Sequence, residues 1–135
     1  MSQENVELVR SIYALWGRGD FSSAEWAHPE IEFAIADGPG AGSWTGLAAV
    51  AEAYRRGWLS AWEEFQVEPD EYRELDDERV LVLSHFRGRG KTSGLDVGQM
   101  GTKSAELFHV RGGKVTRLVI WAEREDAFAD LGLSG

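Results

Sequence analysis

The sequence predicts an α+β fold in which helices come first and a run of antiparallel strands follows. Apolar residues recur every three or four positions over 3–18 and over 47–62, which is typical of amphipathic helices. From residue 63 onward the pattern changes to strands, and the last two strands meet at Gly112-Gly113, a strong two-residue hairpin signal. Helices segregated from a meander of strands are typical of the α+β class. The length of 135 residues indicates one domain over residues 1–135.

The first half of the chain is expected to form three helices and one strand. In order, these are a helix over 3–18, a short helix over 21–26, a strand over 31–37, a loop over 38–43 and a third helix over 47–62. His28-Pro29 is expected to turn the chain before the strand. The strand alternates so that Ile31, Phe33 and Ile35 share one face, and Asp37 continues that face.

The second half is expected to form a four-stranded meander and a terminal helix. Its elements are strands over 65–72, 79–87, 100–111 and 114–121, and a short helix over 123–133 that ends at Gly132. Between Glu63 and Arg79 there are nine acidic residues against two arginines. We interpret this stretch as a solvated edge strand and turn, because charge on an edge blocks stray strand pairing. A cation-binding patch is the rejected alternative.

Composition excludes several classes of function. The chain has 14 basic against 23 acidic residues, a net charge of −9, which argues against nucleic acid and anionic membranes as partners. It has no cysteine, which excludes disulfides and thiolate chemistry and suits a cytoplasmic location. No apolar run reaches the roughly 18 residues of a membrane span, and no basic leader precedes an apolar stretch at the start.

The hairpin turn predicts which residues share a face of the sheet. A regular ladder from the turn places Glu106 opposite Val119, on one face with Phe108 and Trp121. Glu106 is the only carboxylate of that face. The opposite face, which carries His109, is also partly apolar. We therefore expect helices to cover one face and a partner subunit to cover the other, giving a homodimer through the sheet.

Asp37 and Glu106 are candidate acid/base groups because each stands where an apolar residue is expected. Burial raises the pKa of a carboxyl group, so two such groups in one cavity can divide proton transfer between a base and a donor. Two simpler interpretations stay open. Asp37 precedes Gly38 and can turn the chain through its own backbone. Glu106 can pair diagonally with Arg117 across the ladder.

The three histidines give weaker signals. His85, midway along the strand over 79–87, could enter the cavity as a catalytic group, or it could be a buried histidine with its hydrogen bonds satisfied. His28 is expected to cap a turn, and His109 to be structural or interfacial. Their spacing is not that of a zinc site, and we expect no metal.

A series of short motifs carries a family resemblance over nearly the whole chain. The motifs are Asn5–Arg10, Gly19-Asp20, His28–Phe33, Gly46 before the third helix, Val110–Val115 and Ala127–Leu133. In this order they resemble the cone-shaped fold shared by nuclear transport factor 2, ketosteroid isomerase and SnoaL-like polyketide cyclases, and more narrowly the small SnoaL-like proteins of actinobacterial type. The resemblance implies a curved antiparallel sheet wrapped around N-terminal helices. It also implies a conical pocket for a small hydrophobic molecule and a homodimer.

The resemblance also implies roles for single residues. Asp37 falls where ketosteroid isomerases have their general base, and Glu106 falls where they have a second, protonated acid. Tyr54 matches a supporting tyrosine on the third helix. Ile12 stands where those enzymes have the tyrosine that polarises the substrate carbonyl, and Tyr13, one residue on, is expected to point elsewhere. Loss of such a donor typically costs about 100- to 1000-fold in rate, which argues against steroid isomerisation.

Three hypotheses about function follow. The first is a cofactor-independent enzyme (isomerase, cyclase, dehydratase or epoxide hydrolase in type) that acts on a small hydrophobic compound by carboxylate acid/base chemistry. The second is a non-catalytic module that binds such a compound. The third is a dimeric scaffold whose interior is filled by side chains. The candidate catalytic residues are Asp37, Glu106 and His85, and the candidate substrate-binding residues are Phe33, Tyr54, Trp58, Phe108, Val119 and Trp121.

Overall fold

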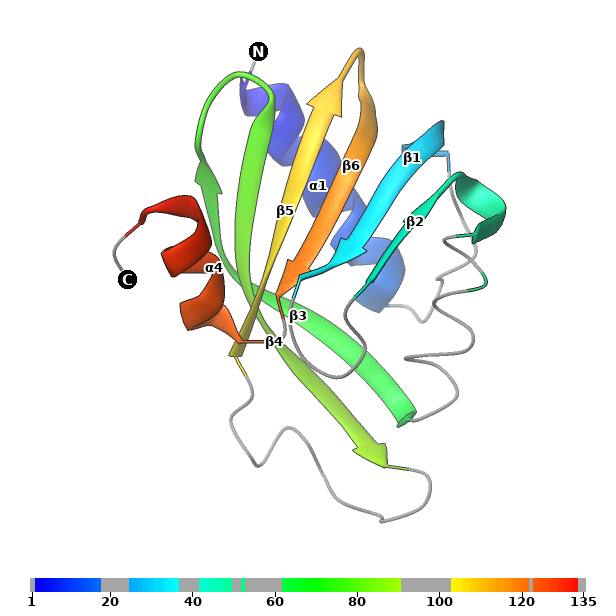
Figure 1. The fold of residues 1–135 in the computed structure, drawn as a ribbon, viewed down its shortest axis with the longest axis vertical. Coiled ribbons are helices and arrows are strands. Elements are labelled where there is room, and N and C mark those ends of the chain that lie inside the picture. The colour runs from blue at the N-terminus through cyan, green and yellow to red at the C-terminus, as the bar shows by residue number, and fades with distance from the viewer. Residues whose placement is uncertain are drawn as a thin grey trace.

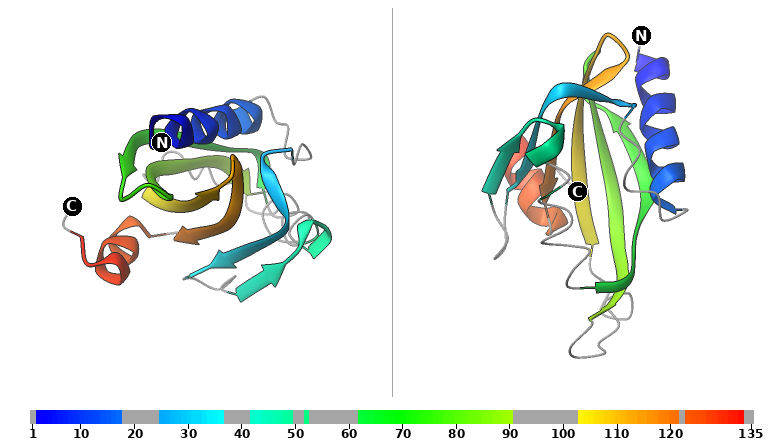
Figure 2. Two further views of the ribbon diagram at one scale, coloured as in Figure 1. Left: turned by 90° about the horizontal axis from the view of Figure 1, so that it is seen from above. Right: turned by 90° about the vertical axis from the view of Figure 1, so that its right-hand side faces the viewer.

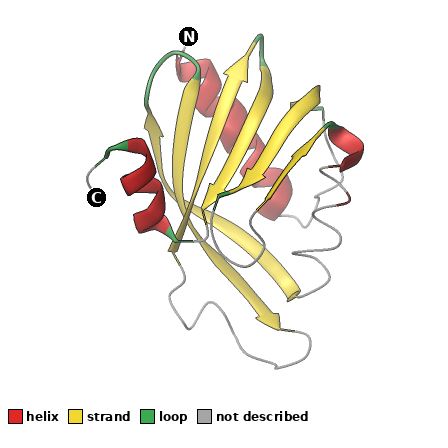
Figure 3. Ribbon diagram, viewed as in Figure 1, coloured by secondary structure: helices red, strands yellow, loops and turns green. Residues whose placement is uncertain are grey.

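The computed structural model describes residues 2–17, 25–36, 42–49, 52, 62–90, 103–121 and 123–133. Its helices and strands confirm the predicted α+β class (Figure 1). In chain order they are α1 (Ser2–Gly17), β1 (Ala27–Ile35), β2 (Gly42–Thr45), β3 (Trp62–Glu74), β4 (Arg79–Gly90), β5 (Lys103–Arg111), β6 (Lys114–Trp121) and α4 (Arg124–Leu131). Figure 3 shows that strands make up most of the described chain.

All six strands join one curved sheet in the order β2-β1-β6-β5-β4-β3 (Figure 1). Strands β3 to β6 form the predicted antiparallel meander. The sheet as a whole is mixed rather than purely antiparallel, because β1 pairs in parallel with β6. Strand β2 includes Gly42 and Ser43, which the sequence pattern assigns to a loop, and it pairs antiparallel with β1. The acidic stretch lies on β3, which forms an edge of the sheet as predicted.

The two helices α1 and α4 lie on opposite sides of the sheet, as both views of Figure 2 show. We call the side toward α1 the inner face and the side toward α4 the outer face. The inner cluster consists of Val6, Val9, Ile12, Tyr13, Ala27, Ile31, Phe33, Val80, Val82, Phe108, Val110, Val115, Leu118 and Ile120. The outer cluster consists of Leu81, Leu83, Ala105, Leu107, Val119, Trp121 and Ala127. A homodimer through the outer face stays a prediction.

Most predicted elements that fall on described residues are confirmed. The first helix and the strand around Phe33 are present, and Ile31 and Phe33 are buried with Ile35 packed beside them. Gly112 and Gly113 form the hairpin turn with φ of 59° and 75°. Gly132 caps α4 in the left-handed region with φ 68°. Most of the predicted helix over 21–26 and most of the helix over 47–62 lie outside the described residues; residues 25 and 26 form a turn, and residues 47–49 are helical.

The predicted register of the β5–β6 hairpin is wrong beyond its first two residue pairs. Val110 pairs with Val115 as expected, but His109 pairs with Arg117, so β6 contains one extra residue, Thr116. Such a bulge shifts every later pair by one and moves the side chains to the opposite face. Glu106 consequently lies opposite Ile120 instead of Val119.

Candidate functional site

Glu106 lies in the middle of the inner face, on β5 between β4 and β6. It is opposite Val82 on one neighbouring strand and Ile120 on the other. Its side chain is among the largest that are fully buried, at 1% exposure. The position follows from strand alternation, because Phe108 and Val110 on the same strand also point into the inner cluster. The Glu106 carboxyl group thus stands at a strand position where the alternation predicts a buried apolar side chain.

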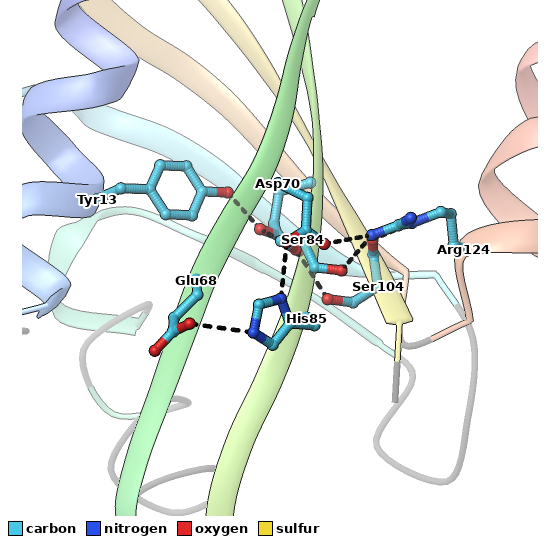
Figure 4. Close-up of polar contacts among 8 residues, drawn as sticks. Tyr13, Glu68, Asp70, Ser84, His85, Ser104 and Arg124 are labelled. Carbon is cyan, nitrogen blue, oxygen red and sulfur yellow. Dashed lines mark hydrogen bonds and ion pairs between the residues drawn. The ribbon is translucent and has the colours of Figure 1, made fainter. Parts of the chain in front are cut away.

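Three hydroxyl groups from three elements form a hydrogen-bonded group with this carboxyl. We call Tyr13, Ser84 and Ser104, which Figure 4 labels, the hydroxyl cluster. The Tyr13 hydroxyl of α1 donates a hydrogen bond to Glu106 Oε1. Ser84 Oγ of β4 lies 2.8 Å from Oε1 and 2.7 Å from Oε2. Ser104 Oγ of β5 lies 2.8 Å from Ser84 Oγ. Both serines are fully buried, so these bonds are formed away from water.

Burial and hydrogen bonding act on Glu106 in opposite directions. Burial disfavours the charged form and raises the pKa of Glu106 from 4.5 to about 7. Hydrogen bonds from the hydroxyl cluster and the positive charge of Arg124 lower that pKa, and they are weaker than the effect of burial. Both protonation states are therefore populated near neutral pH. A carboxyl group of this kind can either give or accept a proton.

Tyr13 contradicts our expectation that it points away from the site. Its ring packs edge-on against Tyr72, with centroids 6.2 Å apart, and against Phe108, with centroids 5.8 Å apart. These contacts aim its hydroxyl at Glu106. Ile12, at the position where ketosteroid isomerases have their tyrosine, is fully buried in the inner cluster. The phenol hydroxyl that contacts Glu106 thus comes from residue 13.

The structure divides the predicted substrate-binding residues between the two faces. Phe33 and Phe108 belong to the inner cluster with Glu106, and Phe33 also contacts Trp44, with ring centroids 5.7 Å apart. Val119 and Trp121 belong to the outer cluster, because of the bulge in β6. Trp121 Nε1 donates to Asp130 Oδ2 of α4 at 2.8 Å. The expectation that Val119 and Trp121 line one cavity with Glu106 is therefore wrong.

His85 does not enter the inner face. Ser84 points inward, so the next residue along β4 points outward. There His85 Nδ1 lies 2.9 Å from Asp70 Oδ1, and Nε2 lies 3.1 Å from Glu68 Oε2 (Figure 4). Both acids belong to the edge strand β3. The expectation that His85 acts as a catalytic group in the cavity with Glu106 is therefore wrong.

Of the other two histidines, His109 lies where it was predicted, but the predicted turn at His28-Pro29 is wrong. Both residues belong to β1, and His28 Nδ1 accepts the backbone N–H of Glu30 within that strand at 3.0 Å. His109 lies on the face opposite Glu106, between Arg79 and Arg117 on the neighbouring strands. Partial burial, followed by the charges of these two arginines, lowers the pKa of His109.

The simpler interpretation of Glu106, a diagonal pair with Arg117, is also wrong. Arg117 points to the outer face, where its Nε lies 3.9 Å from Glu32 Oε2 of β1. The side chains of both residues are at least half exposed. Glu106 thus has hydroxyl partners within the inner face and no guanidinium there among the described residues.

Asp37, Tyr54 and Trp58 lie outside the described residues, so their predicted roles stay predictions. Four residues around Glu106 were not predicted as part of its site: Tyr13, Ser84, Ser104 and Arg124. A signal for the serines was present, because each stands in phase with inner-face apolar residues of its own strand. Arg124 gave no such signal, because it acts from α4 on the other side of the sheet.

Within the described part of the chain, no group of three or more histidine and acidic side chains is arranged to hold a metal ion. No described helix is both long enough and apolar enough to cross a bilayer.

Comparison with known proteins identifies the family. Among solved structures, an NTF2-like protein of unknown function from Burkholderia pseudomallei matches with a TM-score of 0.74 at 19% identity, covering 93% of this chain and 95% of that one. A putative polyketide cyclase from Sinorhizobium meliloti matches with a TM-score of 0.63 at 19% identity, covering 84% and 93%. TerC, co-crystallized with polyporic acid, matches with a TM-score of 0.71 at 22% identity, covering 95% and 97%.

At these identities the solved structures show that the fold is shared. No curated protein sequence matches the chain. The model of the SnoaL-like domain matches residues 9–118, which include most of α1, all six strands except the end of β6, and the whole hydroxyl cluster. The chain belongs to the SnoaL-like domain family.

Proposed function

We propose that this protein binds a small hydrophobic molecule at its inner face and that Glu106 exchanges a proton with it. The observation that carries the proposal is the placement of Glu106, fully buried among apolar side chains, with the hydroxyl groups of Tyr13 and Ser84 at its oxygens and that of Ser104 bonded to Ser84. General acid/base catalysis is most effective when the pKa of the catalytic group lies near the working pH. The pKa of Glu106, about 7, meets that condition.

The hydroxyl cluster can accommodate both protonation states of Glu106. When the carboxylate is ionised, Tyr13 donates to Oε1, Ser84 donates to Oε2, and Ser104 donates to Ser84 Oγ. When Oε2 carries a proton, that proton is donated to Ser84 Oγ, and the Ser84 hydroxyl turns to Oε1, 2.8 Å away. Neither state leaves a hydroxyl group of the cluster without an acceptor. Proton gain and loss thus require rotation of one hydroxyl and no movement of the strands.

Tyr13 is the second group of the proposed site. Its hydroxyl belongs to α1, whereas Glu106 belongs to the sheet, so the pair joins the two layers. When Oε1 instead of Oε2 carries the proton of neutral Glu106, that proton can be donated to Tyr13 Oη, which frees the phenol proton for the oxygen of a bound carbonyl compound. An oxygen that gains negative charge during proton abstraction is stabilised by such a donor. Asp37, by resemblance to ketosteroid isomerases, is the proposed base.

Two solved relatives support the class of ligand. One is described as a putative polyketide cyclase and another was crystallized with polyporic acid. Both share the fold over more than four-fifths of this chain. We therefore propose a cyclic ketone or a related enolisable compound as the ligand class.

Deuterium exchange into simple cyclic ketones tests the proposed proton transfer. Cyclohexanone and 2-tetralone are incubated with the protein in D2O at pH 7, and NMR follows the loss of their α-proton signals. We expect the protein to accelerate exchange, and Glu106→Gln to slow it by about 100-fold, the lower end of what a positioned acid or base contributes. Glu78→Gln is the matched control, because Glu78 is an exposed turn residue paired with Arg111. Equal exchange rates in the Glu106 and Glu78 variants would contradict the proposal.

A second candidate function is binding without chemistry. It is favoured by the completeness of the cluster, since every buried polar side-chain atom of the described residues already has a hydrogen-bond partner. Native mass spectrometry distinguishes the two candidates. A hydrophobic compound that is bound and released unchanged, with no deuterium gained from D2O, supports the binding module over the enzyme.

A further inference from the structure

Arg124 connects the outer face of the molecule to the residues that hold Glu106. It is the first residue of α4, and its side chain is 17% exposed. Its Nη2 donates to the backbone carbonyl of Ser84 at 2.6 Å, and its Nε donates to the backbone carbonyl of Ser104 at 3.2 Å. One guanidinium group thus binds the backbones of both serines of the hydroxyl cluster (Figure 4).

The position of these two serines explains what such a clamp can do. Ser84 and Ser104 are directly opposite each other, next to His85 and Lys103, the last residue pair of the β4–β5 ladder within the described part of the chain. A rotation of either backbone would move a hydroxyl that lies within 3 Å of a Glu106 oxygen or of the other hydroxyl. Arg124 binds this end of the ladder from the outer side, while Glu106 binds it from the inner side.

Arg124 in turn is held by an acidic residue of β3. Its Nη2 lies 2.9 Å from Asp70 Oδ2, and the other oxygen of Asp70 faces His85 Nδ1. Asp70 is the extra residue in a bulge of β3, since Pro69 pairs with Ser84 and Glu71 pairs with Leu83. The bulge brings the Asp70 carboxylate to the outer face beside α4. Figure 4 shows the resulting row of polar side chains, from Arg124 through Asp70 and His85 to Glu68.

We propose that Arg124 is a positioning residue: it fixes Ser84 and Ser104 for hydrogen bonding to Glu106, and its charge, moderated by Asp70, sets how readily Glu106 gives up its proton. The effect of Arg124 on catalysis rests on the proposed function, whereas its effect on the hydrogen bonds and the pKa of Glu106 does not. The positive charge of Arg124 favours the ionised form of Glu106 and lowers its pKa, which agrees with this geometry.

An NMR titration of the Glu106 side chain tests the proposal, because it needs neither ligand nor activity. The protein is labelled with 13C at glutamate side chains, and Glu106→Gln identifies the Glu106 signal. We expect Arg124→Gln to raise the pKa of Glu106 by about 1, the lower end of the effect of a nearby charge. Arg124→Lys, which keeps the charge but has no planar fork, should give a pKa between those of the parent and Arg124→Gln. Arg111→Gln is the control, because Arg111 is an exposed arginine with one ion pair.

Asp70→Asn provides a second test, in which the pKa of Glu106 should shift in the opposite direction. It removes the negative charge nearest to Arg124 and leaves the guanidinium bound to the two carbonyls, so the pKa of Glu106 should fall. A structural role of Arg124 alone would not produce shifts of opposite sign in the two variants. An unchanged Glu106 pKa in folded Arg124→Gln, or an unchanged or raised pKa in Asp70→Asn, would overturn the proposal. If these shifts appear while deuterium exchange stays at the background rate, the proposed function fails and the role of Arg124 stands.

Discussion

The Glu106 carboxyl group combines two properties that are hard to combine in a protein interior. An ionised carboxylate removed from water costs several kcal/mol unless hydrogen bonds or a positive charge compensate. Here three hydroxyl groups and the charge of Arg124 compensate in part, and burial still raises the pKa of Glu106 to about 7. Full compensation would leave the group always ionised at neutral pH. Because the compensation is partial, Glu106 can change its charge near neutral pH.

The raised pKa predicts how the stability of the protein depends on pH. Between pH 4.5 and about 7 the folded protein keeps a proton on Glu106 that the unfolded chain has already lost. The contribution of Glu106 to stability is therefore complete below pH 4.5, falls as pH rises through this window, and levels off above it. The total change is about 3 kcal/mol. Urea denaturation of the parent protein and of Glu106→Gln should show the two stabilities diverging by this amount between pH 4.5 and pH 8.

The comparison with Glu106→Gln separates this effect from other titrating groups. His109, whose pKa is lowered in the folded state, destabilises the protein as pH falls, which is the opposite trend. It is present in both proteins, so its contribution cancels in the difference. A difference in unfolding free energy that stays constant across this pH range would show that Glu106 is ionised throughout.

Sequence patterns identified Glu106 but not its partners. Glu106 follows Ala105 and precedes Leu107 and Phe108, and a carboxylate is unusual among such apolar residues of one strand. Tyr13 was misplaced because helix direction changes by about 100° per residue, and a family resemblance that is correct within one residue still leaves the side-chain direction open. The serine hydroxyls come from two strands whose relative register depends on tertiary pairing. Local patterns along one element do not contain that information.

At the scale of elements, the bulge in β6 decides which side chains meet. A regular ladder would place Arg117 in the inner row with Val115, whereas the bulge exposes Arg117 and buries Leu118 and Ile120 in its place. Arg117 interrupts a row that is otherwise apolar, and this interruption was a sequence signal of the bulge. The signal alone could not predict the bulge, because a diagonal ion pair between Arg117 and Glu106 explained the arginine equally well. The structure decides between the two interpretations through the pairing of His109 with Arg117.

The hairpin turn gives a prediction about backbone strain. Gly113 has φ 75°, and a Cβ added there would meet no atom within 4 Å, so a substitution changes backbone strain alone. Gly113→Ala should destabilise the protein by about 1 kcal/mol, because alanine is strained at positive φ. Gly113→Asn should cost about half as much, since asparagine tolerates this region. Urea denaturation measures both, and equal losses in the two variants would show that the turn relaxes to another conformation.

At the scale of the whole molecule, local signals predicted the meander and missed the long-range pairing. The strands β3 to β6 follow one another along the chain, and each pairs with the next. The parallel pairing of β1 with β6 joins segments that lie far apart along the chain, and it extends the curved sheet beyond the meander to β1 and β2. No residue type in Ala27–Ile35 specifies a parallel partner. The family resemblance predicted the overall architecture, which hydrophobic periodicity alone could not predict.

The outer face depends on α4 in a way that gives a prediction for the whole molecule. Ala127 of α4 is fully buried in the outer cluster, and Ala129 of the same helix is exposed. Ala127→Asp places a carboxylate among Leu83, Leu107 and their neighbours without a partner, which should cost about 3 kcal/mol or more. Ala129→Asp, with the same change in charge and helix propensity, should cost less than about 0.5 kcal/mol.

Ala127→Asp should disrupt the outer cluster more than the inner cluster, because the inner cluster does not contain Ala127. We expect α4 of Ala127→Asp to separate from a sheet that stays folded at low urea concentration, exposing the outer cluster to the dye ANS. The same separation removes Arg124 from the carbonyls of Ser84 and Ser104. The Glu106 pKa should then rise as it does in Arg124→Gln. Loss of all sheet structure in one step, with no state that binds ANS and keeps the inner cluster, would show that the two faces fold as a single unit.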